Sequence, residues 1–217
     1  MMQYSSSGPR KKDGRESRFD SLISFWAQRR RLPFPLVKGI IKQESDFVTY
    51  AKNLSSGAKG LMQLTDVAIR DVQRMRIDHE SDLDIFPYSH EDSQVWLDAD
   101  TNIAYGSYYF KHRCLAFWPE IPDPVEQVRF ALLVYNAGVG HGQVAAQAAR
   151  DSCGQPGPYA KWKAEGSPPG AWQNWHYYKN FIGAKPAPNG RRAKVAECVP
   201  YVELVEKHSR EFGGIPF

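Results

Sequence analysis

Residues 34–45 read FPLVKGIIKQES, and this stretch decides which fold the chain is expected to adopt. Its apolar residues recur at the spacing of one helix face: Leu36, Val37, Ile40 and Ile41. Pro35 lies near the first turn, where the missing N–H of a proline costs a helix little. We therefore predict a buried helix that runs from this proline to about Glu44.

The periodicity on both sides predicts further helices. Apolar residues recur at helical spacing in the segments 19–31, 61–75, 98–113, 125–135, 144–149 and 193–212. Glycine, serine and proline mark the breaks between them, at 53–60, 119–124 and 137–142. No internal repeat or alternating β pattern stands out, so the chain is predicted to be mainly α-helical.

The length favours one domain with appendages. A chain of 217 residues is long enough for one compact core and marginal for two. Residues 1–18 are rich in Ser, Lys and Arg, and we interpret them as a flexible basic tail. Residues 19–217 are then the domain. Within it, about 151–192 changes to Gly, Pro, Trp and Tyr with little periodicity, which is typical of a long functional loop.

Composition and charge narrow the function only a little. The hydrophobic fraction of 42% and the aromatic fraction of 13% are typical of a folded protein. The formal charge of +4 suits an anionic partner, and both nucleic acid and the bacterial wall fit it. The basic residues cluster at 10–18, 29–31 and 191–194, and solvated tails and faces are the favoured explanation of such runs over binding.

The three cysteines indicate neither a zinc site nor a disulfide framework. Cys114, Cys153 and Cys198 show no CxxC spacing. Three buried thiols are the favoured interpretation, and one disulfide between Cys153 and Cys198 is the alternative. Metal-ligand and cofactor motifs are absent from the sequence, so we expect no metal and no cofactor.

The sequence shows no targeting or membrane segment. Residues 1–18 have no apolar core of a secretory signal peptide, and no stretch approaches about 18 consecutive apolar residues. If the substrate lies outside the cytoplasm, we expect another route of delivery. A fragment that lacks its original leader would look the same.

Glu44 is the candidate for acid chemistry. Cleavage of a glycosidic bond needs an acid that still holds its proton near neutral pH, and an apolar setting raises a carboxyl pKa in this way. Glu44 follows an apolar helical run and has Ser45 beside it as a hydrogen-bond partner. By itself, a glutamate at a helix end is more often a solvated surface residue.

Three motifs that follow one another along the chain favour a catalytic role for Glu44 over a surface position. They are Glu44-Ser45, then GAKGLMQL at 57–64, then YNAG at 135–138. This set resembles the lytic transglycosylase family with the goose-lysozyme-like (SLT) fold. The resemblance implies that the glutamate is the catalytic acid and base. It also implies that the Gly-Leu-Met-Gln segment lines the sugar cleft and that the Tyr-Asn-Ala-Gly turn lies across from the acid.

Weaker matches extend the resemblance over about 34–205. The segment 102–110 resembles the family's Asn-Ile-x-x-Gly-x-x-Tyr-Leu helix, and Glu197 with Tyr201-Val202 resembles its closing element. Asp66 stands where the family often has proline, and Cys198 replaces its usual threonine. Neither departure touches the acid. Overall we expect a single lysozyme-like helical domain with a long loop insertion.

The resemblance implies a set of substrate-binding residues, each with a plainer alternative. The set is Ser45, Met62, Gln63, Tyr135, Asn136 and Tyr201. Gln63 can hold an N-acetyl group or cap local backbone, and Met62 can line the cleft or fill the core. The Asn-Ala-Gly part is also ordinary turn chemistry. Tyr201 is expected to reach Glu44 and fix its carboxyl, or else to be ordinary core.

The expected mechanism depends on the number of catalytic carboxyls, and the motifs support only one. Typical glycosidases use two carboxylates, whereas Asp46 and Asp66 have no independent support as a second one. With Glu44 alone, the sugar's own 6-hydroxyl is expected to attack the anomeric carbon and give 1,6-anhydro-N-acetylmuramic acid without water. The alternatives are a muramidase of the same fold that admits water, a catalytically silent wall-binding module, and a nucleic-acid binder.

Partners follow from this interpretation. Peptidoglycan strands are the expected substrate, and nucleic acid is not expected to be a partner. Because we expect no signal peptide, we predict delivery to the periplasm or cell wall by a phage particle or an envelope-spanning secretion apparatus. The aromatic residues at 159, 162, 172 and 175–178 either extend the glycan groove or anchor the long loop by packing.

Overall fold

The computed structural model describes residues 14–78, 95–155 and 170–214. Apart from two isolated β-bridges, the regular elements in these ranges are helical, as predicted. The main helices are α1 (Asp20–Arg29), α2 (Phe34–Ser45), α3 (Asp66–Asp78), α4 (Ala99–Tyr109), α5 (Pro124–Ala137), α6 (Val139–Ser152), α8 (Trp175–Tyr178) and α9 (Val195–Glu211). Short 3-10 turns occupy Val95–Leu97, Ala171–Gln173 and Lys179–Phe181, and Phe110–Leu115 is a π-helix.

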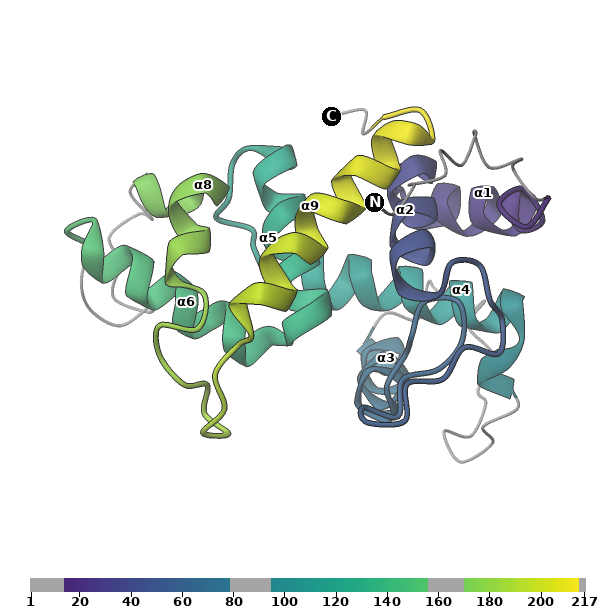
Figure 1. Ribbon diagram of the computed structural model, residues 1–217, viewed down its shortest axis with the longest axis horizontal. Coiled ribbons are helices and arrows are strands. Elements are labelled where there is room, and N and C mark those ends of the chain that lie inside the picture. Colours follow the sequence, from purple (N-terminus) through teal and green to yellow (C-terminus); the bar gives the residue numbers. More distant parts are fainter. Residues whose placement is uncertain (1–13, 79–94, 156–169, 215–217) are drawn as a thin grey trace, which may run out of the picture.

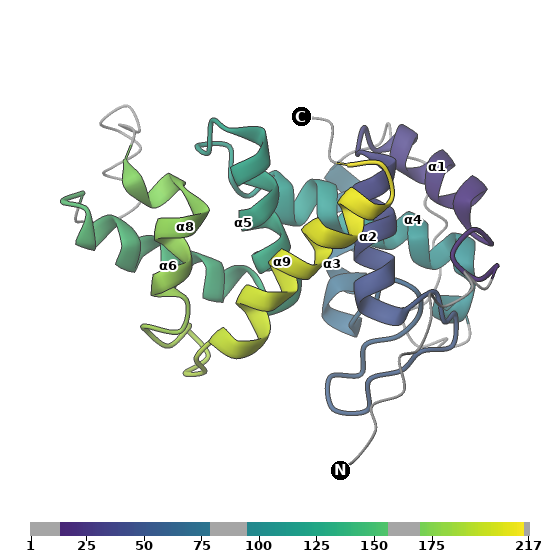
Figure 2. The same cartoon turned by 45° about the horizontal axis from the view of Figure 1, so that its top comes forward.

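The helices form two groups with α5 and α9 between them. Helices α1 to α4 lie on one side and α6 and α8 on the other, while α9 crosses diagonally over the junction (Figures 1 and 2). The larger core cluster draws residues from both groups, including Ile40, Leu132, Ala149 and Val205. A smaller cluster joins α3 to α4. The junction beneath α9 is where α2 ends.

Helices α2 and α9 approach closely because α2 carries a glycine at the crossing. A Cβ on Gly39 would lie 2.5 Å from Oγ of Ser209 and 3.0 Å from the carbonyl oxygen of Val205. Such contacts are too short for a methyl group, so only glycine fits the crossing as it stands. The C-terminal end of α2 is thereby held against the middle of α9.

Several predicted boundaries were wrong, and backbone conformation explains each. The helix predicted from Leu61 begins at Asp66, because Gly60 (φ 79°) and Gln63 (φ 46°) have left-handed backbone. The turn predicted at 137–142 is confined to the region of Gly138 (φ 90°), and α6 begins at the next residue. The helix predicted to Arg113 changes to π-helix after Tyr109.

The long segment after α6 packs onto the domain through its aromatic residues. Helix α6 itself extends to Ser152, and the described part of the segment carries η4 (Ala171–Gln173), α8 and η5 (Lys179–Phe181). Trp172, Trp175 and Tyr178 are buried, and Tyr178 stacks on Phe130 at a ring distance of 4.0 Å. These residues anchor the segment, which favours the packing interpretation. Positions 159 and 162 lie outside the described residues.

The three cysteines are free thiols, so the alternative of a disulfide between Cys153 and Cys198 was wrong. Cys114 and Cys198 are buried, and Cys153 is half-buried. In the ranges that the structure describes, no helix is both long and apolar enough to cross a membrane. Residues 14–18, placed in the tail by sequence, form turns, and Glu16 binds Lys42 of α2 at 3.0 Å.

Candidate active site

The end of α2 places Glu44 at the junction between the two helix groups. Glu44 follows Ile40 by one helical turn, and Ile40 is fully buried. Residues four apart lie on the same helix face, so Glu44 continues the buried face just beyond the core. Asp46 ends the helix with left-handed backbone (φ 49°), after which the chain turns away. The carboxyl is therefore partly buried at the edge of the core.

The phenol of Tyr201 forms a hydrogen bond with the carboxyl of Glu44. The Tyr201 hydroxyl donates to Oε1 of Glu44 at 2.6 Å. Burial raises the pKa of Glu44 from 4.5 to about 7, and the hydrogen bond from Tyr201 acts in the opposite direction. Glu44 therefore holds its proton up to near neutral pH. The resemblance implied this contact, and the structure contains it.

A cleft of about 570 Å³ opens beside Glu44. Its walls come from the end of α2 and from the loop that follows. The lining residues include Lys42, Glu44, Ser45, Ala51, Lys52, Asn53 and Gln63. Two of the predicted binding residues, Ser45 and Gln63, thus share one cleft with the predicted acid.

Asn102 of α4 fixes the turn that forms one wall of this cleft. Its Nδ2 donates to the carbonyls of Lys59 (3.1 Å) and Trp96 (2.8 Å), and its Oδ1 accepts from the N–H of Met62 (2.7 Å). A Cβ on Gly60 would lie 2.2 Å from Nδ2 of Asn102, so glycine is required there. The turn is locked to the core by one buried amide.

Ser45 and Tyr135 hold the same turn from the other side. The Ser45 hydroxyl donates to the carbonyl of Leu61 at 2.8 Å, and the Tyr135 hydroxyl donates to the carbonyl of Met62 at 2.7 Å. Burial, followed by the nearby charge of Glu44, raises the pKa of Tyr135 well above its usual value. Tyr135 therefore lies close to Glu44 as a neutral phenol.

Gln63 caps local backbone and Met62 fills the core, which are the structural alternatives to substrate binding for these two residues. The amide nitrogen of Gln63 donates to the carbonyls of Ala51 (3.1 Å) and Gly60 (2.9 Å), which caps local backbone. Its Oε1 is left to accept a donor from a ligand in the cleft. Met62 is fully buried, and a Cβ on Gly106 would lie 2.4 Å from its sulfur. The side chain of Met62 fills the core and does not line the cleft.

Asn136 lies apart from this cleft, in a neighbouring hollow of about 200 Å³. The hollow is formed by the end of α5, the start of α6, the start of α9 and the loop before α9. Its lining residues are Asn136, Ala137, His141, Arg191, Arg192, Ala193, Lys194, Glu197 and Cys198. Burial lowers the pKa of His141. The structure thus separates Asn136 from Gln63 and assigns it to a second, basic hollow.

The two other carboxylates considered from sequence are bound to lysines. Asp46 is exposed and pairs with Lys42 at 2.5 Å, and Asp66 pairs with Lys59 at 2.9 Å. Burial raises the pKa of Glu44 to about 7. Asp46 also lines the cleft, but its ion pair with Lys42 leaves Glu44 as the candidate proton donor among these three carboxyls.

Two residues that support the site are not evident from the sequence. Asn102 belongs to a motif of the predicted helix, yet its three hydrogen bonds hold the cleft wall. A polar residue on the apolar face of a predicted helix was the available signal. Gly39 was read as one letter of an apolar run, although it sets the distance between α2 and α9. No local pattern reveals that contact.

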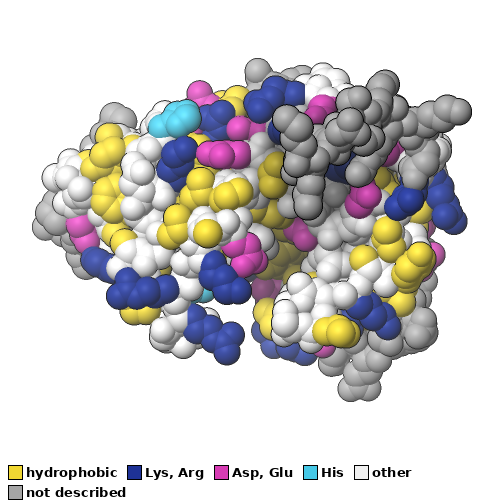
Figure 3. Space-filling model, in the orientation of Figure 1, with side chains coloured by type: hydrophobic (Ala, Val, Ile, Leu, Met, Phe, Trp, Pro, Cys, Tyr) yellow, Lys and Arg dark blue, Asp and Glu magenta, His cyan; other side chains and the backbone are white. Residues whose placement is uncertain are grey.

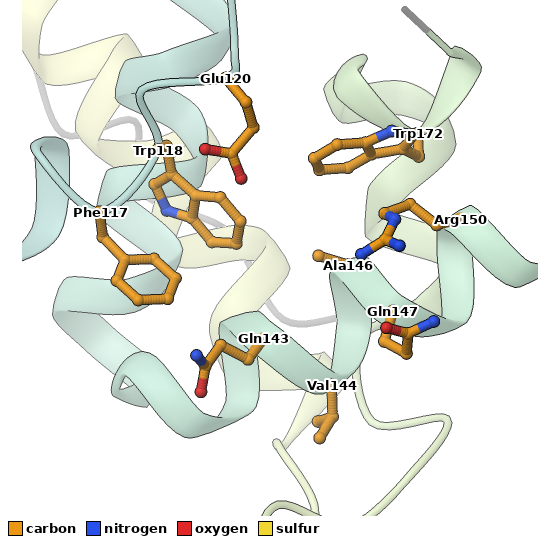
Figure 4. Close-up of a pocket in the computed structure, with 9 residues that line it drawn as sticks. All are labelled: Phe117, Trp118, Glu120, Gln143, Val144, Ala146, Gln147, Arg150 and Trp172. Carbon is orange, nitrogen blue, oxygen red and sulfur yellow. The ribbon is translucent and has the colours of Figure 1, made fainter. Parts of the chain in front are cut away.

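A further pocket of about 290 Å³ lies away from these residues, between residues 117–120 and α6 (Figure 4). Trp118 and Trp172 face it from opposite sides, with Arg150 beside Trp172. None of the predicted site residues lines it. It is therefore separate from the candidate active site.

Comparison with known proteins gives a consistent family. Residues 21–154 match the family model described as "Transglycosylase SLT domain". The chain is 31% identical over 137 residues to membrane-bound lytic murein transglycosylase F of Desulfosudis oleivorans, a match that covers 62% of this chain and 25% of that protein.

Solved structures share the fold. An inactive mutant of the lytic transglycosylase Slt of Pseudomonas aeruginosa matches with a TM-score of 0.58 and 18% identity, covering 92% of this chain and 25% of that one. The 70 kDa soluble lytic transglycosylase SLT70 of Escherichia coli matches with a TM-score of 0.57 and 21% identity, covering 94% and 26%. These matches confirm the predicted lysozyme-like fold. The chain spans about a quarter of the length of these relatives.

Proposed function

Because the chain belongs to the transglycosylase SLT family, we propose that it cleaves the β-1,4 bond from N-acetylmuramic acid to N-acetylglucosamine in peptidoglycan. The product is 1,6-anhydro-N-acetylmuramic acid, and Glu44 is the single general acid and base. One observation supports this proposal above the others. Glu44 lies in a cleft, and burial raises the pKa of its carboxyl to about 7.

In the first step, protonated Glu44 gives its proton to the glycosidic oxygen. The bond from that oxygen to the anomeric carbon of the muramyl residue then breaks, and the glucosaminyl residue leaves with a 4-hydroxyl. The electron pair of the broken bond stays on the leaving oxygen. Glu44 becomes a carboxylate, and the Tyr201 hydroxyl at 2.6 Å stabilises this charge.

In the second step, the Glu44 carboxylate takes the proton of the muramyl 6-hydroxyl. Oxygen 6 bonds to the anomeric carbon of the same ring, which closes the 1,6-anhydro bridge and restores protonated Glu44. Between the steps the N-acetyl carbonyl oxygen of the same sugar bonds to the electron-deficient anomeric carbon, and oxygen 6 then displaces it. Because nucleophile and electrophile belong to one sugar, the attack has the proximity advantage of a unimolecular reaction.

A pKa near 7 suits both steps. A group that must first donate and then accept a proton works best when its pKa lies near the pH of operation. Burial and Tyr201 act on Glu44 in opposite directions, so the balance between them sets this value. Asp46 and Asp66 are already bound to lysines and take no part.

A muramidase of the same fold is the second candidate function. It would need a group that activates water on the face of the sugar opposite the acid. A wall-binding module without turnover is the third. A module of that kind has no need for a half-buried acid paired with a buried phenol, and this pair supports the enzyme over the module.

Product chemistry tests the proposal. Purified peptidoglycan is digested with the wild-type chain, and the released muropeptides are weighed by mass spectrometry. Products lighter by one water than hydrolytic muropeptides, with no reducing end, are expected. Hydrated products with a reducing end would replace the proposal by the muramidase, and no release would replace it by the binding module.

The route to the wall stays a prediction. We propose that a phage particle or an envelope-spanning secretion apparatus carries the enzyme to peptidoglycan. Copurification of the chain with intact virions or with the isolated apparatus is the expected result. Its recovery only as a free protein after fractionation of the producing cells would contradict this part of the proposal and leave the chemistry untouched.

A further inference from the structure

Three charged side chains form a network that has no task in the chemistry proposed above. The Nε of Arg129 in α5 donates to Oε1 of Glu206 in α9 at 2.6 Å, and its Nη1 donates to Oε1 of Glu126 at 2.7 Å. The other oxygen of Glu126 accepts from the backbone N–H of Trp175, the first residue of α8, at 2.5 Å. No more than 19% of each charged side chain is exposed. None of the three lines the cleft or the basic hollow, so the network does not act by contact with a ligand in either place.

The network joins α9 to α5 at the level where α9 also meets α2. The surface is recessed between the two helix groups (Figure 3), and α9 crosses from one group to the other (Figure 1). A Cβ on Gly39 of α2 would lie 3.0 Å from the carbonyl oxygen of Val205, which is the neighbour of Glu206 in α9. Helix α9 is therefore held from two directions at one point, by close packing against α2 and by an ion pair to α5.

This point of support lies close to the hydrogen bond on the proposed acid. Along α9, Tyr201 precedes Glu206 by five residues, which is about 7.5 Å of helix. Along α2, Glu44 follows Gly39 by five residues, which is about the same length. The hydrogen bond from Tyr201 to Glu44 thus joins the same two helices within about two turns of the point where they are held.

Helix α9 is weakened on the other side of Tyr201. Pro200 lies inside the helix, and a proline has no N–H to donate to the carbonyl four residues earlier. The first turn of α9 is therefore joined to the rest of the helix by one hydrogen bond fewer. The position of Tyr201 then depends on the part of α9 that follows it, where Arg129 binds Glu206.

The hydrogen bond on Glu44 is more sensitive to a shift of α9 than its burial is. The Tyr201 hydroxyl lies 2.6 Å from Oε1 of Glu44, and such a bond weakens steeply when donor and acceptor separate or lose their alignment. The burial of Glu44 comes from many surrounding atoms on several elements, so a small movement of one helix changes it little. A small displacement of α9 therefore removes mainly the contribution of Tyr201.

We propose that Arg129 and Glu206 are positioning residues, which hold α9 where the hydroxyl of Tyr201 meets Glu44. They act through Tyr201 and touch neither the substrate nor the reacting carboxyl. Glu126 supports them, because it binds the guanidinium of Arg129 and joins α8 to α5. This inference rests on the proposed function, since it takes the role of Glu44 from it.

The pKa of Glu44 reports this positioning through the sign of its change. Burial raises that pKa to about 7 and the hydrogen bond from Tyr201 lowers it, so loss of the bond raises it further. Removal of a carboxylate elsewhere has the opposite direct effect, because Glu44 ionises more easily when less negative charge surrounds it. The other charged or titratable side chains near Glu44 are Tyr135, Lys42, Asp46 and Lys52. The test leaves all four unchanged.

Glu206→Leu in the full chain tests the inference. The substitution removes the ion pair between α9 and α5 and leaves Arg129 paired with Glu126, so no lone charge stays buried. Glu203→Leu is the matched control. It makes the same change on the same helix, at an exposed glutamate that pairs with Lys179 at 3.2 Å.

The pKa of Glu44 is measured by NMR titration of its side-chain carboxyl carbon, whose signal is assigned by its absence in Glu44→Gln. Glu206→Leu is expected to raise this pKa by about 0.5–1 pH unit, which is part of the rise expected for Tyr201→Phe. Glu203→Leu is expected to change it by less than about 0.2 pH units or to lower it. On a Tyr201→Phe background, Glu206→Leu is expected to change it by less than about 0.2 pH units, because the bond through which it acts is gone.

Two results would overturn the inference. An unchanged or lowered pKa in Glu206→Leu would mean that the ion pair does not hold Tyr201 on Glu44. An equal rise on the Tyr201→Phe background would mean that the network acts on the burial of Glu44 and not through Tyr201.

Glu206→Gln is the second variant, and it decides the question if Glu206→Leu does not fold. Glutamine keeps the size of the side chain and offers Arg129 a neutral acceptor, so a smaller rise of the Glu44 pKa is expected. An unchanged or lowered pKa would contradict the inference here as well. Failure of the proposed function is visible separately, because the titration needs no substrate and the function is read from the products of the wild-type chain.

Discussion

The hydroxyl of Tyr201 donates a 2.6 Å hydrogen bond to Oε1 of Glu44, although the two residues lie 157 positions apart in the sequence. The contact exists because α9 packs along α2 over the glycine at position 39. The proton affinity of the proposed acid therefore depends on a helix crossing as well as on its own burial.

Tyr201→Phe is expected to move the pH dependence of cleavage upward. The hydrogen bond from Tyr201 lowers the pKa of Glu44, so its loss raises that pKa further above about 7. Activity that needs protonated Glu44 then falls at a pH higher by about one to two units, since a hydrogen bond to a charged group is worth about 1.5–3 kcal/mol. The pH profile of kcat/KM measures the shift, and a fall at a lower pH than in the wild type would contradict the assignment.

Glu44→Gln is expected to stabilise the fold at alkaline pH. The folded state holds the Glu44 proton up to about pH 7, whereas the unfolded chain releases it near 4.5. The folded state thus binds more protons between these values, and wild-type stability falls as pH rises through this window. Above it, the loss amounts to about 3 kcal/mol at most.

Glutamine is neutral at every pH and avoids this loss. Urea unfolding at pH 8 is expected to show the Gln variant more stable than the wild type by about 1–3 kcal/mol, with the difference vanishing near pH 4. A difference that stays constant across this range would show that Glu44 is not a carboxyl with a raised pKa.

Gly39→Ala tests the helix crossing. The added Cβ would lie 2.5 Å from Oγ of Ser209, which can rotate away, but also 3.0 Å from the carbonyl oxygen of Val205 and 3.1 Å from the backbone nitrogen of Ser209. Relief of these backbone contacts requires α9 to move slightly, and Tyr201 moves with it. We expect a loss of about 1–3 kcal/mol in the free energy of unfolding and a fall in kcat. Gly140→Ala in α6 is the matched control, because its Cβ would meet nothing closer than 3.5 Å. Equal effects of the two substitutions on stability and kcat would contradict the role of Gly39.

Asn102→Ala tests the cleft wall. It removes three hydrogen bonds and leaves the N–H of Met62 and two carbonyls without their buried partner. The expected cost is about 2–4 kcal/mol of stability, with a higher KM because the turn that carries Gln63 loosens. Asn180→Ala removes one exposed hydrogen bond and is expected to cost about 0.5 kcal/mol or less. A neutral Asn102→Ala in denaturant unfolding would contradict the clamp.

Local periodicity was enough to predict most of the fold. The apolar face of α2 and its early proline predict both the helix and its end near Glu44, because burial and proline geometry act over a few residues. The start of α3 was misplaced because a left-handed residue at Gln63 is not visible in an apolar pattern. The early start of α6 was missed because one glycine, and not a longer turn, separates it from α5.

The site was predictable only in part. Ordered motifs predict that Glu44, Gln63 and Tyr201 belong together, and the structure brings Glu44 into contact with Tyr201 and into one cleft with Gln63. The burial of Met62 and the position of Asn136 in a separate hollow follow from tertiary packing, which no short motif encodes. The basic hollow itself combines residues from α5, α6, the loop before α9 and α9, so it exists only after folding.

The proposal that Glu44 is the single general acid and base is tested most directly by one rate. This is the rate at which Glu44→Gln releases anhydro-muropeptides from purified peptidoglycan. Glutamine keeps the size of the side chain and removes the proton that both steps use. We expect the rate to fall by at least about a thousandfold, with unchanged circular dichroism, while Asp46→Asn costs no more than a few-fold. Release of anhydro products by Glu44→Gln at a rate near that of the wild type would contradict the assignment of Glu44 as acid and base.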